Sequence, residues 1–236
     1  MQTTPLGDSA LIIRLRDNLA DGSESVLDEV LALLDHIKRA QIPGVIELAS
    51  AYTTVALFFN PLDVIGAGAE PDRVFAWLEE KINRAVSDGD GQHKRASPSV
   101  IEIPVCYDEK FALDLDEVSK HVGLSPEEVV DLHCSAQYRV NCLGFTPGFP
   151  YLSGLPGQLA TPRRAVPRKE VPAGSVGIGG AQTGIYPMRS PGGWNVIGCT
   201  PLRLFDANKI PPALLHAGDC VRFRSIERDE FEALMK

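Results

Sequence analysis

The chain has 236 residues, of which 44% are hydrophobic and 23% are charged. These values are typical of a folded globular protein with one large or two small domains. The first residues lack the basic and long apolar segments of a signal peptide, and no apolar run reaches the roughly 18 residues needed to cross a bilayer. Five cysteines without a CxxC pair argue against a disulfide framework. We therefore expect a reduced, cytoplasmic protein without a membrane partner.

The charge is distributed unevenly along the chain. The net charge is −8, yet the window from Cys134 to Phe205 carries seven basic residues and a single acid, Glu170. This window therefore has a charge of +6 and the remainder −14. A positive region in an acidic protein favours an anionic small molecule or an acidic protein partner. Nucleic acid is disfavoured as a partner, because the basic residues are few and the rest of the chain would repel a polyanion.

The first hundred residues alternate between strand-like and helix-like patterns. Apolar residues at helical spacing predict one helix over Ser25–Arg39 and another that begins at Pro71 and buries Val74, Leu78, Ile82 and Val86. Runs rich in branched residues predict strands at Ser9–Leu15, Val45–Leu48, Tyr52–Phe59 and Val100–Val105. The order βαββαβ predicts a ferredoxin-like α/β domain over residues 1–106.

Residues 107–236 begin with two short predicted helices. The first covers Asp114–Val122 and ends at Gly123, and the second opens with a capping box at Ser125–Glu128. From Gly144 to Gly198 there are twelve glycines and eight prolines, which leave little room for helices. Apolar residues nevertheless recur throughout, so we expect short strands in a compact β-barrel or sandwich. A late strand over Val221–Ile226 and a terminal helix over Asp229–Met235 complete an α+β chain.

The glycine-rich segment GSVGIGGAQTGIYP (Gly174–Pro187) invites comparison with nucleotide-binding loops. It fails the dinucleotide pattern, because Gln182 stands where the third glycine should follow Gly177 and Gly179. It also lacks the Gly-Lys-Ser/Thr of a phosphate loop. Ser175 lies in a near match to a nucleophile elbow, but the residues that follow cannot supply the required helix.

The histidines give no metal-binding pattern. All five are scattered, without an HxxxH pair or a Cys/His cluster, so no metal site is predicted. His133 lies at the end of its predicted helix, where it can cap carbonyl groups and interact with the helix dipole. A structural role and a functional role for His133 both stay open.

Three further segments have the chemistry of a ligand site. In TPRRAVPRKEVP (Thr161–Pro172), prolines hold Arg163 and Arg168 on an extended ribbon, and no nearby acid offers these arginines a partner. In SPGGW, Gly192 and Gly193 permit close approach of the backbone to a ligand, and Trp194 is a stacking surface or a core residue. The uncharged stretch GFTPGFPYL (144–152) is expected to shape a pocket wall at the entry to the barrel.

Taken together, these segments resemble one family. The series comprises His133, Tyr138, GFTPGFPYL, PRRAVPR, VPAGSVGIGGAQTGIYP, SPGGW, IGCTP, LFD and AGDCVRF. In this order it resembles the B subunit of bacterial 5-oxoprolinase, a family also named allophanate hydrolase subunit 1 and Kip-type histidine-kinase inhibitor. The likeness spans nearly the whole chain and is densest from His133 to Asp206. Cys199 in IGCTP departs from it, because the resemblance predicts an arginine there.

The resemblance implies a cyclophilin-like β-barrel after the N-terminal α/β domain. It also implies a paralogous C subunit and a separate A subunit, which together with this chain would hydrolyse the lactam of 5-oxo-L-proline to L-glutamate with ATP as co-substrate. Two alternatives come from the same resemblance: an inhibitor that binds a sensor histidine kinase, and a carboxyltransferase-like subunit of a urea- or allophanate-related enzyme.

Under this interpretation the site residues fall into two groups. The catalytic group has His133 as an acid, base or orienting residue and Arg163 and Arg168 as anchors for an anion. The substrate-binding group supplies polar contacts, aromatic walls and exposed backbone; its members are Phe145, Pro147, Gly148, Phe149, Tyr151, Gln182, Thr183, Tyr186, Gly192, Gly193 and Trp194.

Overall fold

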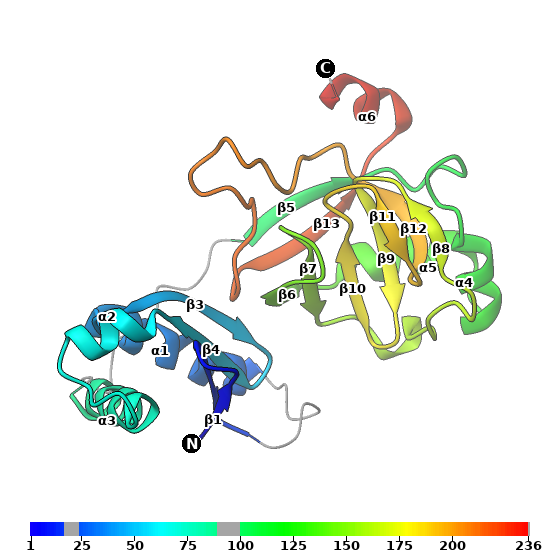
Figure 1. Cartoon of the computed structure of the whole chain (residues 1–236). Helices are drawn as coiled ribbons and strands as arrows, with labels where there is room; N and C mark the ends of the chain where they lie inside the picture. The colour runs from blue at the N-terminus through cyan, green and yellow to red at the C-terminus, as the bar shows by residue number, and fades with distance from the viewer. Residues whose placement is uncertain (17–23, 89–99, 236) are drawn as a thin grey trace. The chain divides into compact units, whose positions relative to one another are not determined.

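The computed structural model describes residues 1–16, 24–88 and 100–235. The chain divides into two compact units, Met1–Ala96 and Ser97–Lys236. Both combine helices with a β-sheet (Figure 1). Among the described residues, no helix is both long and apolar enough to span a bilayer.

The first unit contains a four-stranded antiparallel sheet with the strand order β1-β2-β4-β3. Alternate residues of β2 and β4, such as Ile13 and Leu57, pack with the apolar stripes of the helices, such as Ile37 and Leu78. Its elements are β1 (Gln2–Leu6), β2 (Ala10–Arg14), α1 (Glu24–Ala40), β3 (Val45–Ala51), β4 (Thr54–Phe59), α2 (Pro61–Gly66) and α3 (Val74–Ser87).

The predicted βαββαβ order is not what the described residues form. Strand β1 was not predicted, because it is largely exposed and contains a proline, so it lacks an alternating apolar pattern. The short helix α2 was not predicted either. The helix predicted from Pro71 begins at Val74, and Val86 is exposed rather than buried on its stripe. A ferredoxin-like domain is therefore not confirmed.

The second unit contains a seven-stranded sheet with the order β12-β9-β10-β7-β6-β13-β5. All its neighbours are antiparallel except β13 and β5, which lie side by side and run parallel (Figure 1). Its elements are β5 (Val100–Val105), α4 (Leu115–Val122), α5 (Pro126–Ser135), β6 (Tyr138–Leu143), β7 (Pro150–Ser153), the 3-10 helix η2 (Gly157–Leu159), β8 (Arg168–Val171), β9 (Ser175–Gly179), β10 (Gln182–Ile185), β11 (Ser190–Gly192), β12 (Asn195–Cys199), β13 (Cys220–Ser225) and α6 (Arg228–Leu234).

Strand β5 corrects a second expectation. The sequence pattern placed it in the N-terminal sheet, but all six of its residues pair with β13. The strand therefore belongs to the second unit, because the late strand near the C-terminus supplies its hydrogen-bonding partner. Local sequence cannot reveal a partner that lies more than a hundred residues further along the chain.

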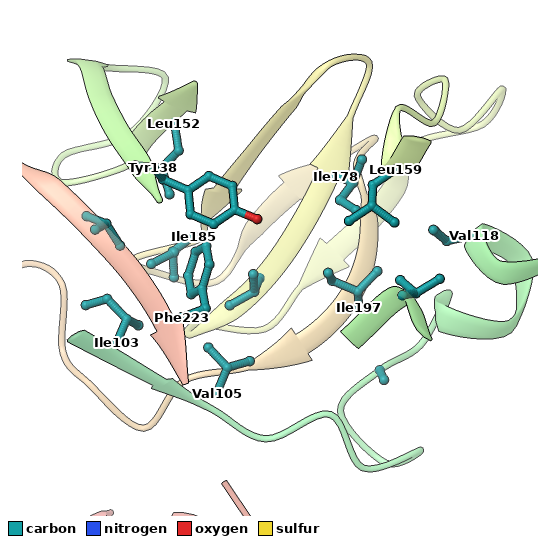
Figure 2. Close-up of a cluster of buried hydrophobic side chains, with 14 of the residues drawn as sticks. Ile103, Val105, Val118, Tyr138, Leu152, Leu159, Ile178, Ile185, Ile197 and Phe223 are labelled. Carbon is teal, nitrogen blue, oxygen red and sulfur yellow. The ribbon is translucent and has the colours of Figure 1, made fainter. Parts of the chain in front are cut away.

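The seven-stranded sheet curls into a nearly closed barrel. Its two edge strands approach each other at an isolated antiparallel bridge between Cys106, just after β5, and Cys199, at the end of β12. The barrel interior is filled by branched and aromatic side chains, and Figure 2 shows Leu152, Ile197 and Phe223 directed into this shared space. The expectation of a barrel is confirmed at this level.

The end of α4 and the start of α5 lie where the sequence predicts them. Gly123 ends α4 in the left-handed conformation with φ of 72°. Ser125 accepts a hydrogen bond from the Glu128 N–H, and the Glu128 carboxylate accepts one from the Ser125 N–H, which completes the capping box of α5. Helix α4 packs against β12 and α5 against β13.

Candidate functional site

The two sides of strand β10 contact different hydrophobic clusters. Because successive side chains of a strand point to opposite faces, Thr183 and Ile185 face the barrel interior while Gly184 faces away from it. On this outer face lies a separate aromatic cluster that contains Phe149, Tyr186 and Trp194. The candidate pocket is built on this second cluster.

The glycines of β9 and β10 form a floor for Trp194. A Cβ atom on Gly179 would lie only 2.5 Å from the indole, and one on Gly184 would lie 3.0 Å from it and 2.7 Å from the carbonyl oxygen of Pro150. No residue with a side chain fits at either position without displacing the ring or the backbone. The glycine-rich segment that resembles a nucleotide loop therefore serves to seat a tryptophan.

Phe149 is the centre of the aromatic cluster. Its ring centroid lies 4.9 Å from that of Tyr151, 5.2 Å from Tyr186 and 5.5 Å from Trp194, mostly in edge-to-face arrangements. Above this cluster opens a pocket of about 340 Å³. It is lined by Phe145, Phe149, Tyr151, Arg163, Arg164, Pro167, Tyr186, Pro191, Gly192, Gly193 and Trp194.

The loop GFTPGFPYL forms one wall of the pocket. It connects β6 to β7 and is closed by the hydrogen bond from the Gly144 N–H to the Phe149 carbonyl, at 3.1 Å. Phe145 has a positive φ of 68°, unusual for a phenylalanine, and its ring is 61% exposed at the pocket rim. Gly148 also has a positive φ, and a Cβ there would lie 2.8 Å from that of Phe205. The stretch is a packed wall rather than a linker.

Two arginines, Arg163 and Arg164, line this pocket, and Arg163 is the more exposed of the two. Its side chain is exposed, and its guanidinium lies 5.8 Å from the centroid of the Trp194 ring. Within the described residues no carboxylate forms an ion pair with it. Burial raises the pKa of Tyr151 and of Tyr186, so both phenols keep their protons at neutral pH. The pocket thus combines aromatic walls, phenolic hydroxyls and a cation available to a ligand.

The neighbouring arginines are already paired. Asp114, which is 1% exposed, accepts hydrogen bonds from Arg164 and from both terminal nitrogens of Arg168, the latter at 2.6 and 2.7 Å. Its carboxylate also accepts the Val196 N–H at 2.7 Å. The premise that Arg168 lacks an internal partner was wrong, because its partner lies 54 residues earlier in the sequence. The pair with Asp114 raises the pKa of Arg168.

His133 lies inside the barrel and does not line the pocket. Its ring is fully buried and stacks on Phe223 with centroids 4.4 Å apart. The Thr183 hydroxyl donates to the Gly177 carbonyl at 3.0 Å, so it accepts from His133 Nε2–H at 3.1 Å. His133 Nδ1 is then the acceptor for the Tyr107 hydroxyl at 2.8 Å.

This network holds His133 as a neutral ring. Burial alone lowers its pKa from 6.5 to about 3, and both ring nitrogens have partners. Burial also raises the pKa of Tyr107, which keeps that hydroxyl protonated. The arrangement favours the structural interpretation of His133 that the sequence left open. Proton exchange with a ligand in the pocket would require an opening of the barrel.

The structure brings eight predicted site residues together at the pocket. Pro147 is exposed on the loop, Gln182 is half-buried at the start of β10, and Gly148 and Thr183 are buried, so these four do not line it. Three further lining residues, Arg164, Pro167 and Pro191, were not predicted, although all three lie in the segments TPRRAVPRKEVP and SPGGW. The role of Asp114 was not predicted either, because this residue has the sequence context of an ordinary helix N-cap.

Comparison with known proteins places this chain in a family. The sequence profile of the family described as carboxyltransferase domain, subdomain C and D, matches residues 1–215. The B subunit of 5-oxoprolinase from Bacillus subtilis (strain 168) is 41% identical over 98% of this chain and 95% of that protein. The chain belongs to the family of 5-oxoprolinase B subunits. Its resemblance in sequence is thereby confirmed.

Solved structures extend this relationship. The crystal structure of TTHA0988 is 36% identical, with a TM-score of 0.77 over 92% of this chain and 40% of that one, so this chain spans less than half of that protein. The urea amidolyase of Kluyveromyces lactis has a TM-score of 0.65 over 98% of this chain and 15% of its own, at 19% identity. This second likeness shows a carboxyltransferase-like fold and nothing further.

Proposed function

We propose that this protein is the B subunit of a 5-oxoprolinase, which acts with the A and C subunits to hydrolyse 5-oxo-L-proline to L-glutamate with ATP. The observation that carries the proposal is the 41% identity, over nearly the full length of both chains, to a protein named as the B subunit of 5-oxoprolinase. We place the reaction in the cytoplasm, where ATP is made and where free cysteines such as these five are usual.

We assign the ring substrate to the aromatic pocket. 5-Oxoproline is a flat five-membered lactam with one carboxylate, so it needs an apolar slot and a cation at the mouth of that slot. Phe149, Tyr186 and Trp194 supply the slot, and Arg163 supplies a planar cation that suits a carboxylate. Arg164 pairs with Asp114 and Glu117, and Arg168 pairs with Asp114, so we assign the exposed Arg163 to hold the substrate. Arg163 is then a binding residue.

The role of ATP follows from the chemistry of the substrate. An unstrained amide is a poor electrophile, and phosphorylation of its oxygen creates a leaving group before water attacks. The glycine-rich segment of this chain is occupied by Trp194, so it is not free to hold phosphates. We therefore place ATP in one of the partner subunits or at the interface with it, with the aromatic pocket facing that interface.

Reconstitution tests the proposal. Purified protein is mixed with the A and C subunits, ATP and 5-oxoproline, and glutamate release is followed with and without this chain. We expect release that depends on all three proteins and on ATP. Release that is absent, or unchanged when this chain is omitted, contradicts the proposal. Inhibition of kinase autophosphorylation without the C subunit would then support the histidine-kinase alternative instead.

A further inference from the structure

The seam of the barrel is formed by two cysteines. Cys106 lies directly after β5 and Cys199 ends β12, and these are the two edge strands of the seven-stranded sheet. The Cys106 N–H donates to the Cys199 carbonyl at 2.8 Å, and the Cys199 N–H donates back to the Cys106 carbonyl at 3.0 Å. Two such reciprocal bonds define a directly opposed, hydrogen-bonded antiparallel pair.

This pairing brings the two thiols within reach of each other. Directly opposed residues place their side chains on the same face of a sheet, and in a hydrogen-bonded pair the Cα atoms are about 5.5 Å apart. That separation lies inside the range of about 4.4–6.8 Å found across disulfides. Both side chains also belong to one small apolar cluster with Phe111, Ile226 and Phe231. The two cysteines are free thiols in this structure.

We propose that Cys106 and Cys199 are a reversible redox pair whose disulfide closes the barrel covalently at its seam. The oxidant is a peroxide such as hydrogen peroxide. The Cys199 thiol loses its proton and its sulfur attacks a peroxide oxygen, which gives a sulfenic acid and releases water. The Cys106 sulfur then attacks that sulfur, the S–S bond forms, and a second water leaves. Two thiols are oxidised by two electrons and one peroxide is reduced to two waters.

The same geometry makes the bond easy to reduce again. Opposed Cβ atoms in an antiparallel pair are about 4.5–5.5 Å apart and are closer in non-hydrogen-bonded pairs. A disulfide needs a Cβ separation of about 3.5–4.5 Å, so a bridge at this hydrogen-bonded pair draws the strands together and stores strain. Strained disulfides have higher reduction potentials and are the labile ones. The bridge is therefore suited to reversible oxidation rather than to permanent stabilisation.

Helix α6 controls access to the pair. Phe231 of α6 and Ile226 just before it cover the thiols, so that Cys106 is 1% and Cys199 8% exposed. Burial raises the pKa of Cys106, and raises that of Cys199 to about 12, so neither is a thiolate while α6 is docked. The helix has only seven residues, and a helix this short is only marginally stable by itself. Oxidation should proceed through its transient opening.

Peptide mapping of the folded protein tests the proposal. The protein is exposed to hydrogen peroxide, its remaining thiols are alkylated in denaturant, and it is digested without reductant. We expect a linked peptide joining Cys106 and Cys199, a loss of two of the five alkylatable thiols, and full recovery with dithiothreitol. Cys142→Ser, which removes another buried thiol, should form the same link, and Cys199→Ser should not. Retention of all five thiols, or links confined to other cysteines, would overturn the proposal.

A second variant tests the role of α6. Phe231→Ala removes the ring that covers the pair, so the link should form several-fold faster at the same peroxide concentration. Leu234→Ala, on an exposed position of the same helix, is the matched control and should leave the rate unchanged. Equal rates of disulfide formation in the two variants and in the unsubstituted protein would overturn control by α6. The peptide mapping described above uses the unsubstituted protein, so it does not depend on the folding of either variant.

Discussion

The two faces of β10 differ in how completely their polar groups are satisfied. On the inner face, Thr183 and His133 form a closed chain of hydrogen bonds with Tyr107 and the Gly177 carbonyl. On the outer face, the Trp194 ring packs on Gly184, and Arg163 lies over that ring without a carboxylate partner among the described residues. One four-residue strand thus separates a sealed interior from a surface with unused binding capacity.

This difference separates residues that build the site from residues available to a ligand. A buried polar group must be satisfied internally, because leaving it unpaired costs about 1–3 kcal/mol. An exposed arginine has no such requirement, since water solvates it until a ligand arrives. The inner network and Asp114 should therefore govern stability, whereas Arg163 should govern binding. Four substitutions or titrations test this division, and we give them from the largest expected effect to the smallest.

Replacement of Asp114 should have the largest effect. Asp114→Ala removes the carboxylate that accepts from Arg168 and the Val196 N–H, while Arg164 keeps its bond to Glu117, and should lower the free energy of unfolding by about 3–5 kcal/mol. Denaturant unfolding followed by circular dichroism measures this loss. Asp116→Ala, at an exposed position two residues further along, is the control and should cost less than about 1 kcal/mol. Equal stabilities of the two variants would show that Asp114 does not hold the arginine-bearing segment Thr161–Pro172 in place.

The glycine floor should be the next most sensitive feature. Gly184→Ala places a Cβ atom against the Pro150 carbonyl and the Trp194 ring and should cost about 1–3 kcal/mol. The displaced indole should also change its fluorescence emission. Gly157→Ala introduces a methyl group where nothing lies within 4 Å, so its stability should stay within about 0.5 kcal/mol. An unchanged free energy of unfolding in Gly184→Ala would mean that Trp194 and the Pro150 carbonyl can move to accept the added methyl group.

His133 should make stability depend on pH. Its pKa is about 3 in the folded protein and 6.5 when solvated, so between these values the unfolded chain binds a proton that the folded chain does not. The contribution is complete above about pH 6.5, and a drop of one pH unit below that value should lower the free energy of unfolding by up to about 1.4 kcal/mol. His133→Gln should flatten this slope, whereas exposed His216→Gln should preserve it. Parallel slopes in the two variants would contradict the assignment.

Replacement of Arg163 should have the smallest effect. It should weaken substrate binding and leave the stability of the fold unchanged. Arg163→Gln should raise the KM for 5-oxoproline in the reconstituted enzyme by roughly tenfold through loss of a charge-assisted contact, with the melting temperature unchanged. Arg189→Gln, which removes an exposed arginine paired with Glu170, should alter neither quantity. A lowered melting temperature with an unchanged KM would place Arg163 among the structural residues.

The sequence by itself determined the local features of this protein. Helix caps at Gly123 and Ser125 and the barrel strands follow from short-range rules, since each depends on residues only a few positions apart. The motif series identified the family, and the segments around Arg163 and Trp194 contained most of the pocket. These residues could be found because turn chemistry and unpaired charge leave a local signature.

Only the tertiary structure decided how these segments are paired. The partnership of β5 with β13 and the Asp114 carboxylate that pairs with Arg168 join residues more than fifty positions apart, and Trp194 packs on glycines that lie ten or more positions before it. The same holds for His133, whose place inside the barrel depends on Thr183, 50 residues later. A contact of this kind has no local signature, because either partner alone has the sequence of an ordinary strand, cap or turn.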